Sequence, residues 1–393
     1  MQRRDFIRSM AAASLAASMP EFVFAAPAVP GTFGAAGDDA YRKLLILIEL
    51  KGANDGLNTV VPYADPEYYR LRPRIAIKRD EVLQLSEREG LHPSLAALMP
   101  LWQANELAVV RGVGYANPNL SHFRSIEIWD TASSSEQVLQ QGWLARAFRA
   151  HPVPRSFSAD GVIVGSAEMG PFTGGARAVT ITNTEQFLRQ ARLATPGHMS
   201  GNRALDHILG VEDEVVQAAK GLGGGAALST TFPNGPFGNA VRTAANVVAG
   251  KEPVAAIRLT LNGFDTHQNQ AGTHAALLRQ FGEGLAALKA ALVELNRWDS
   301  TLILTYAEFG RRAQENASGG TDHGTANAHF VTGGAVKGGL YGQGPQLDRL
   351  DNGNLVHAVD FRSLYATALE RWWGISAAGP LGGRYPMIDL IKA

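Results

Sequence analysis

Short, continuous apolar runs alternate with helical patterns through most of the chain. Runs typical of buried strands occupy 43–50, 106–115, 254–261 and 302–307, with shorter candidates at 161–165, 176–182 and 328–336. Between them, apolar residues recur at helical spacing at 122–132, 273–299 and 360–374. Alternation of buried strands with helices predicts an α/β fold with a mostly parallel central sheet flanked by helices.

Two segments depart from this alternation. Residues 186–250 show helical spacing interrupted by Gly-rich breaks, which predicts a helical insertion packed beside the sheet. Residues 26–42 are small and rich in Gly and Pro, which is typical of a linker. We therefore expect a single large α/β domain over 43–393, which carries that insertion.

The first 25 residues have the pattern of an export signal. Paired arginines, Arg3 and Arg4, precede a weakly apolar, Ala-rich stretch and a small-residue cleavage site after Ala25. This pattern predicts a twin-arginine signal peptide, the twin-arginine export machinery as a partner, and a periplasmic or secreted mature protein. No later stretch approaches the ~20 apolar residues that a transmembrane helix needs.

Composition narrows the chemistry. The chain has no cysteine, which excludes disulfides, thiolate zinc sites, iron–sulfur clusters and cysteine nucleophiles. Lys+Arg and Asp+Glu balance at 36 each, so no basic surplus indicates a nucleic acid or an anionic membrane as partner. Any metal must be held by imidazole, carboxylate, amide or hydroxyl groups.

Polar side chains follow the predicted strands where each strand ends. They are Asn54 and Asp55, Ser121 and His122, Asp265 and His267, and Glu308 and Arg311, with Asp322 and His323 before the last strand. Ligands of parallel α/β sheets gather at the carboxyl ends of the strands, so we expect these groups to converge. Carboxylates and imidazoles suit a divalent ion, with zinc first and manganese, calcium or magnesium also allowed. The predicted metal ligands are Asp55, Asp265, His267, Glu308 and His323.

Ser121, His122 and Arg311 are the predicted catalytic residues. A hydroxyl at a helix N-terminus can act as a nucleophile whose alkoxide is stabilised by the metal and the helix dipole. Arg311 would hold an anionic substrate or pair with a carboxylate. Simpler roles stay open: Ser121 as a plain N-cap and His122 as a solvent-facing residue at the start of the helix.

Other residues near these motifs have structural alternatives. Asp55 lies in "NDG" and could serve only as a turn former. His274 and His329 are interpreted as structural. Asp322 is interpreted as a residue that supports the neighbouring ligand His323.

Several motifs together resemble a known family. They are the paired arginines, "LKGANDGLNTVVPY", "SHF", "QGWLAR", "GFDTHQNQ", "TYAEFGRR" and "GTDHG". Over residues 43–375 the chain resembles a large bacterial family of exported proteins of unknown function, described as sulfatase-like, within the alkaline phosphatase superfamily. The resemblance implies an alkaline-phosphatase-like sheet with metals at the strand ends. It implies metal positions at Asp55, Asp265, His267, Glu308 and His323, and a nucleophile at Ser121.

The chain also departs from the pattern of that superfamily. Phe309 stands where a second metal ligand would follow Glu308, which favours one metal over two. Without cysteine the chain cannot form a formylglycine from Cys, and Ser121 lacks the proline expected two residues later in a serine-type sulfatase motif. A conventional sulfatase is therefore disfavoured.

Two hypotheses of function remain. The first is an exported metal-dependent hydrolase of a phosphate or sulfate ester, or of a related anionic small molecule or polymer, with Ser121 or a metal-bound water as nucleophile. The alternative is a non-catalytic exported binding or assembly factor on a degenerate alkaline-phosphatase-like fold. A dinucleotide-binding oxidoreductase is disfavoured because "GANDG", not G-x-G-x-x-G, follows the first strand.

Overall fold

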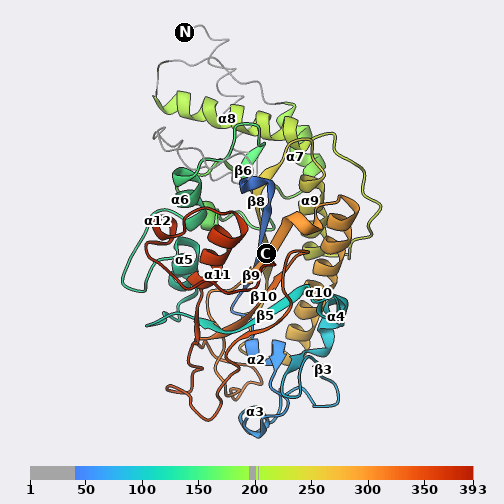
Figure 1. Cartoon of the computed structure of the whole chain (residues 1–393), viewed down its shortest axis with the longest axis vertical. Coiled ribbons are helices and arrows are strands. Elements are labelled where there is room, and N and C mark those ends of the chain that lie inside the picture. The colour runs from blue at the N-terminus through green and yellow to red at the C-terminus, as the bar shows by residue number, and fades with distance from the viewer. Residues whose placement is uncertain (1–39, 194–200, 202, 393) are drawn as a thin grey trace.

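The computed structural model describes residues 40–193, 201 and 203–392, and a nine-stranded sheet lies at the centre of this part of the chain (Figure 1). The strand order is β11-β5-β10-β9-β1-β8-β6-β7, with β12 beside β5. The strands are β1 (Leu44–Lys51), β5 (Leu107–Gly114), β6 (Ala159–Val164), β7 (Ala178–Thr180), β8 (Val254–Asn262), β9 (Thr301–Tyr306), β10 (Asn327–Thr332), β11 (Gly339–Gly342) and β12 (Val359–Asp360). All these pairings are parallel except those of β10, which is antiparallel to β9 and β5. The predicted α/β fold with a mostly parallel sheet is confirmed.

The apolar run of β1 is continuous because both faces of this strand are covered. Leu44, Ile46 and Ile48 belong to one apolar cluster, and Leu45 and Leu47 belong to the cluster on the opposite face. Successive side chains of a strand point to opposite faces, so a strand buried on both sides needs apolar residues throughout. Each such side chain contributes about 1.5–3 kcal/mol when it is fully buried.

Helices cover the two faces of the sheet, as Figure 1 shows. The helices α9 (Pro236–Val248) and α10 (Gln270–Glu294) supply apolar residues to one cluster. The opposite cluster is built with α5 (His122–Thr131), α6 (Trp143–Ala150), α11 (Arg362–Ala366) and α12 (Ala378–Leu381). The closing helix that the sequence predicts at 360–374 begins as α11 and continues as a π-helical segment, Thr367–Trp372.

The segment predicted as a helical insertion contains helices. They are α7 (Thr184–Ala191), α8 (Arg203–Leu222) and α9. The third of these is part of the core, because Val241 and Ala244 of α9 are fully buried in the cluster shared with β8 and α10.

Short elements fill the stretch between β1 and β5. They are α2 (Gly56–Thr59), β2 (Val60–Val61), α3 (Pro66–Leu71), β3 (Leu83–Gln84), β4 (Gly90–Leu91), a 3-10 helix (Pro93–Leu98) and α4 (Met99–Gln103). The strands β2, β4 and β3 form a second, antiparallel sheet. Further 3-10 turns are Ala40–Arg42, Gly170–Phe172 and Trp298–Ser300.

The predicted signal peptide (1–25) and residues 26–39 of the predicted linker lie outside the described residues. Residues 40–42, at the end of that predicted linker, form a 3-10 turn. Tyr41 is buried against Phe148 and Trp373, and its hydroxyl donates to the carbonyl of His151 at 2.5 Å. Within the described part of the chain, no helix combines the length and the apolar character that crossing a membrane requires.

Two histidines are buried in the core as neutral side chains. His274 of α10 lies 2.9 Å from Asn54 Oδ1 through its Nε2, and His329 of β10 packs edge-on against Trp129. Burial lowers the pKa of each imidazole to about 3. Both positions therefore fit the structural interpretation.

These histidines make stability depend on pH. Unfolded histidine titrates near 6.5, so below about pH 6.5 the unfolded chain binds protons that the folded chain refuses, and the free energy of unfolding falls as pH drops toward about 3. We expect His329→Leu to reduce this pH slope by up to about 1.4 kcal/mol per pH unit. Urea unfolding of wild type and variant between about pH 6.5 and pH 4 measures it.

The matched control is His151→Leu, at a partly exposed position after α6. This side chain is not enclosed in the core, so the variant should keep the wild-type slope. Equal slopes in all three proteins would contradict the assignment.

Candidate metal centre

Segments from five places in the sequence meet at one edge of the sheet. The loops after β1, β5, β8 and β9 reach it from the carboxyl ends of parallel strands. The strand β10 is antiparallel to its neighbours β5 and β9, so the residues that precede it lie at the same edge. His323 therefore comes close to groups that follow the other strands, as the sequence analysis expects.

Four ligand-type atoms form the centre of this edge. Asp265 Oδ1 lies 3.4 Å from His122 Nε2, 3.1 Å from His267 Nε2 and 3.4 Å from His323 Nε2. The Nε2 atoms of His267 and His323 are 3.0 Å apart. Ligands that are 2.0–2.1 Å from one zinc ion at tetrahedral angles lie about 3.3 Å from one another. The observed spacing fits a shared ion, and His122, Asp265 and His323 form a compact group of potential ligands.

His122 is oriented by the buried carboxylate of Glu308. Its Nδ1 lies 2.7 Å from Glu308 Oε1, which also accepts the N–H of Gly52 at 3.0 Å. The opposite nitrogen, Nε2, is buried and has no hydrogen-bond partner in the described part of the chain. A histidine whose Nδ1–H donates to a carboxylate while its Nε2 lone pair is free has the usual arrangement of a metal ligand.

The other two imidazoles are held in the same way. His323 Nδ1 donates to the carbonyl of Leu120 at 2.8 Å, and because a carbonyl can only accept, the neutral ring leaves Nε2 unprotonated. His267 Nδ1 lies 3.4 Å from Asp322 Oδ1, which accepts from Asn316 Nδ2 at 3.0 Å. In both rings Nε2 is thus the nitrogen available to an ion.

Arg311 holds the carboxylate of Asp265 in place. Its guanidinium is buried and donates to Asp265 Oδ1 at 2.6 Å. Its N–H groups also bind backbone carbonyls, those of Gly52, Ala53, Phe264 and Thr321. Of the two roles predicted for Arg311, pairing with a carboxylate and holding an anionic substrate, the structure shows the first, because its donors join the loops and orient Asp265.

The loops approach too closely for side chains at one point. Gly52 has φ +104°, and a Cβ there would lie 2.5 Å from the backbone nitrogen of Asp265. Glycine is the residue that adopts this φ without strain and leaves the space empty. The position of Asp265 thus depends on a glycine after β1.

Glu308 and Phe309 lie beside the imidazoles. Glu308 is 2% exposed, its Oε1 contacts His122, and its Oε2 is buried with no hydrogen-bond partner in the described part of the chain. Direct binding of an ion by Glu308 stays a prediction. Phe309 is buried, with its ring centroid 4.8 Å from that of His122 and 4.7 Å from that of His323. Phe309, which departs from the superfamily pattern, thus packs its apolar ring against the imidazoles of His122 and His323.

Asp55, a predicted metal ligand, is paired with an arginine. Both of its oxygens are bound by the fully buried Arg72, Oδ1 also accepts the N–H of Leu57 at the start of α2, and Oδ2 accepts from Gln270. Burial raises the pKa of Asp55, but the charge and hydrogen bonds of Arg72 outweigh it and leave the pKa lowered. A buried guanidinium requires a carboxylate, and Asp55 meets that need instead of joining the four ligand atoms.

The electrostatics keep the carboxylate ionised. Burial raises the pKa of Asp265, yet the hydrogen bond and charge of Arg311 lower it overall. The hydrogen bond to Glu308 raises the pKa of His122, whereas burial lowers the pKa of His323. The site therefore presents one carboxylate and imidazoles of unequal basicity, of which His122 is more basic than His323.

Ser121 lies next to the ligands in the chain and is exposed. It is the N-cap residue of α5, but its hydroxyl makes no capping hydrogen bond, while its N–H donates to Asn119 Oδ1 at 2.9 Å. Its neighbours are Leu120, which supports His323, and the ligand-type residue His122. The alternative that Ser121 is only an N-cap residue therefore lacks the capping hydrogen bond that this role requires.

Three features of this centre have no clear signal in the sequence. His122 was assigned to catalysis, although its adjacency to Ser121 at a helix start gives no indication of which way its ring points. The carbonyl of Leu120 carries no sequence signal at all, because any residue supplies one. Asp322 lies beside His267 and not His323, although the sequence places it next to the latter.

Comparison with solved structures gives distant likenesses. They include a protein in the alkaline phosphatase superfamily from Vibrio parahaemolyticus, at 13% identity over 87% of this chain and 68% of that chain with a TM-score of 0.41. Ps i-CgsB in complex with k-i-k-neocarrahexaose matches at 13% identity over 86% and 72%, with a TM-score of 0.39. The C-terminal periplasmic domain of EcEptC from Escherichia coli, in complex with Zn, matches at 10% identity over 74% and 73%, with a TM-score of 0.36.

No curated protein matches the sequence. One family model does, over residues 107–376, a span that contains all four ligand-type residues, Asp265 and the three histidines. This match extends over more than half of the chain, which therefore belongs to the family described as proteins of unknown function, DUF1501.

Proposed function

We propose that this chain is a metal-dependent hydrolase of a phosphate or sulfate ester, or of a related anionic group, that works outside the cytoplasm. One observation carries the proposal: Asp265 Oδ1 lies 3.1–3.4 Å from the Nε2 atoms of His122, His267 and His323, and His122, Asp265 and His323 form a compact group of potential ligands. A carboxylate oxygen and imidazole nitrogens that converge in this way are the donor atoms that a divalent cation binds. The predicted signal peptide supports the location, in the periplasm or secreted.

The donor set indicates which ion would fit. Three imidazole nitrogens and one carboxylate oxygen, without thiolate, suit zinc first, with manganese, calcium or magnesium as weaker matches. Each of the four groups has its own supporting partner, which is the usual construction of a protein metal site. A divalent ion held there would act as a Lewis acid toward an anionic oxygen of the substrate.

The start of α5 would bind the anion beside these ligands. The first N–H groups of a helix have no intrahelical acceptor and carry partial positive charge, so they favour phosphate or sulfate oxygens. The exposed Ser121 hydroxyl, free of a capping bond, would attack the phosphorus or sulfur, or would orient a water molecule that does so. Arg312, exposed next to Arg311, adds a cation near Asp322, whose pKa it helps to lower.

Metal content is the first test. Purified mature protein, measured by inductively coupled plasma mass spectrometry, should hold about one equivalent of zinc or take it up, because the four atoms form one shell. Asp265→Ala and His323→Ala should each lose it. Asp348→Ala and His151→Ala, at sites outside the shell, should bind as wild type.

If wild type neither contains nor takes up any divalent ion, the hydrolase proposal is wrong. The alternative, a non-catalytic exported binding or assembly factor, would then be favoured.

Glu308→Gln tests the support of the shell. It keeps the shape of the side chain but removes the charge that orients His122, so metal affinity should fall by about 10–100-fold. Competition with a chromophoric zinc chelator measures the Kd, and circular dichroism checks that the variant is folded. An unchanged Kd would show that Glu308 does not act through His122.

Ser121→Ala tests the nucleophile. Screening p-nitrophenyl phosphate and sulfate esters provides a turnover assay for wild type. The variant should retain its metal, because Ser121 contributes no ligand atom, and should lose most of the turnover, because the attacking oxygen is gone. Undiminished turnover with metal retained would assign the attack to water alone.

A further inference from the structure

A hollow of about 390 Å³ lies between the start of α7 and one face of α9. Its volume is within the range of about 300–1,000 Å³ that small-molecule sites have. The residues that follow β7 line it, and β7 is parallel to its neighbour β6, so the hollow lies at the same edge of the sheet as the metal centre. The strand β6 separates β7 from β8, however, and none of the four ligand-type residues lines the hollow.

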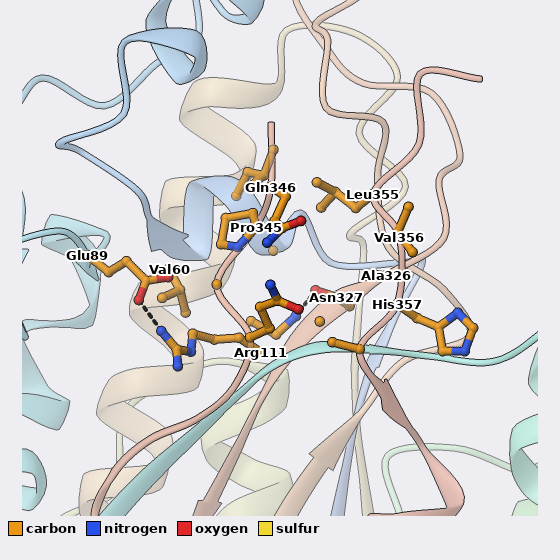
Figure 2. Close-up of a pocket in the computed structure, with 17 residues that line it drawn as sticks. Val60, Glu89, Arg111, Ala326, Asn327, Pro345, Gln346, Leu355, Val356 and His357 are labelled. Atoms are coloured by element: carbon orange, nitrogen blue, oxygen red, sulfur yellow. Dashed lines mark hydrogen bonds and ion pairs between the residues drawn. The ribbon is translucent and has the colours of Figure 1, made fainter. Parts of the chain in front are cut away.

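The hollow differs from the cavity in Figure 2, which lies beside α2 and β5. That cavity has a volume of about 120 Å³, and Val60, Leu355 and Val356 lie around it. An apolar protein cavity of about 150 Å³ binds benzene, so the cavity in Figure 2 is too small for a ring of that size. The hollow beside α7 is larger, and its walls are polar.

Every residue that lines the hollow has a polar side chain. The lining residues are Thr182, Asn183, Thr184, Glu185, Asn239, Arg242, Thr243 and Asn246. The last four recur at helical spacing and therefore form one face of α9. Other residues of the same helix, such as Val241 and Ala244, are buried in the apolar cluster. One helix thus presents its apolar face to the core and a polar face to the hollow.

Several of these side chains keep hydrogen-bonding capacity that the fold does not use. Thr243 is 5% exposed, and its hydroxyl makes no hydrogen bond in the described part of the chain. This hydroxyl is not enclosed by protein atoms, so it faces the hollow that Thr243 lines. The amide of Asn246 is likewise neither enclosed nor hydrogen-bonded to a described residue. Asn183 Oδ1 accepts the N–H of Gln186 at 2.9 Å, which leaves its Nδ2 as a donor without a partner among the described residues.

The charges that line the hollow balance each other. Arg242 lies 5.7 Å from the ring centroid of Phe232 and forms no ion pair with a described residue. Glu185 is the one carboxylate among the lining residues; its side chain is 86% exposed and lies 3.8 Å from Arg189. One guanidinium and one carboxylate give the lining no net charge, so an uncharged ligand suits it better than an ion does.

We propose that this hollow binds an uncharged saccharide, either a free sugar or one residue of a glycan chain. Each sugar hydroxyl both donates and accepts hydrogen bonds, and so do the amides of Asn239 and Asn246 and the hydroxyl of Thr243. An aromatic or lipid-like ligand is disfavoured because no apolar side chain lines the hollow. The proposal does not depend on the metal centre or on hydrolysis.

Saturation-transfer difference NMR on the mature protein tests the proposal with D-glucose, D-galactose, maltotetraose and cyclohexanol as probes. We expect at least one sugar to bind saturably with a Kd on the order of 1–10 mM, because its hydroxyls exchange hydrogen bonds with water for similar ones with the protein. Tighter binding by maltotetraose than by glucose identifies a residue of a glycan chain, and equal or weaker binding identifies a free sugar. Cyclohexanol, a ring with a single hydroxyl, should not bind saturably.

Three variants localise the binding, and circular dichroism checks that each is folded. Asn239→Trp fills the hollow from an exposed position, so the fold should tolerate it while sugar binding is lost. Asn234→Trp, at an exposed asparagine that does not line the hollow, should bind as wild type. Thr243→Val keeps the shape of the side chain and removes one hydroxyl, so the Kd should rise by about threefold to tenfold.

Four results would overturn the proposal. The first is saturable binding by none of the sugars, which would leave the hollow to water, and the second is cyclohexanol binding as tightly as the sugars. The third is unchanged sugar binding in Asn239→Trp. The fourth is binding of glucose 6-phosphate at least about tenfold more tightly than glucose, with this binding lost in Asn239→Trp, which would assign the hollow to an anion.

Discussion

The guanidinium of Arg311 is the contact on which the arrangement at the sheet edge depends. It is buried, and burial of an unpaired charge costs several kcal/mol, so its donors must find acceptors. The acceptors belong to the loops after β1 and β8 and to Thr321 before β10. Arg311, in the loop after β9, thus binds three other stretches of the chain. It also orients Asp265, and the Oδ1 atom of this aspartate is the one that all three histidines face.

The sequence was sufficient to predict the sheet and the edge where the polar groups meet. Unbroken apolar runs mark strands buried on both faces, and the polar residues that end such strands must lie at one edge of a parallel sheet. The small elements at 52–103 were not predicted, because strands of two residues and helices of four leave no periodic pattern. The packing of Tyr41 was likewise not predicted, because the composition of its segment is typical of a linker.

The same reasoning could not separate ligands from their supports. Glu308 and His122 both follow strands in the sequence. In the structure, Glu308 lies behind the ring of His122, and this arrangement depends on side-chain orientation and not on the spacing of the residues in the sequence. Asp55 follows a strand as the other predicted ligands do, and no pattern in the sequence connects it with Arg72, which lies 17 residues away. Phe309, which looked like a lost ligand, packs against two imidazoles and limits the access of water to them.

The antiparallel strand β10 has a consequence for how such a site could change. Because β10 runs back along β9, the connection between them, 307–326, leaves and returns at the same edge as a hairpin, in which Arg311 pairs with His323. That one excursion carries Glu308, Phe309, Arg311, Asp322 and His323. Exchange of this single connection between relatives would replace ligand, supports and apolar wall together, while the strands that fold the domain stay as they are. This connection therefore carries one of the four ligand-type residues together with the supports of the others, and it can change while the strands stay the same.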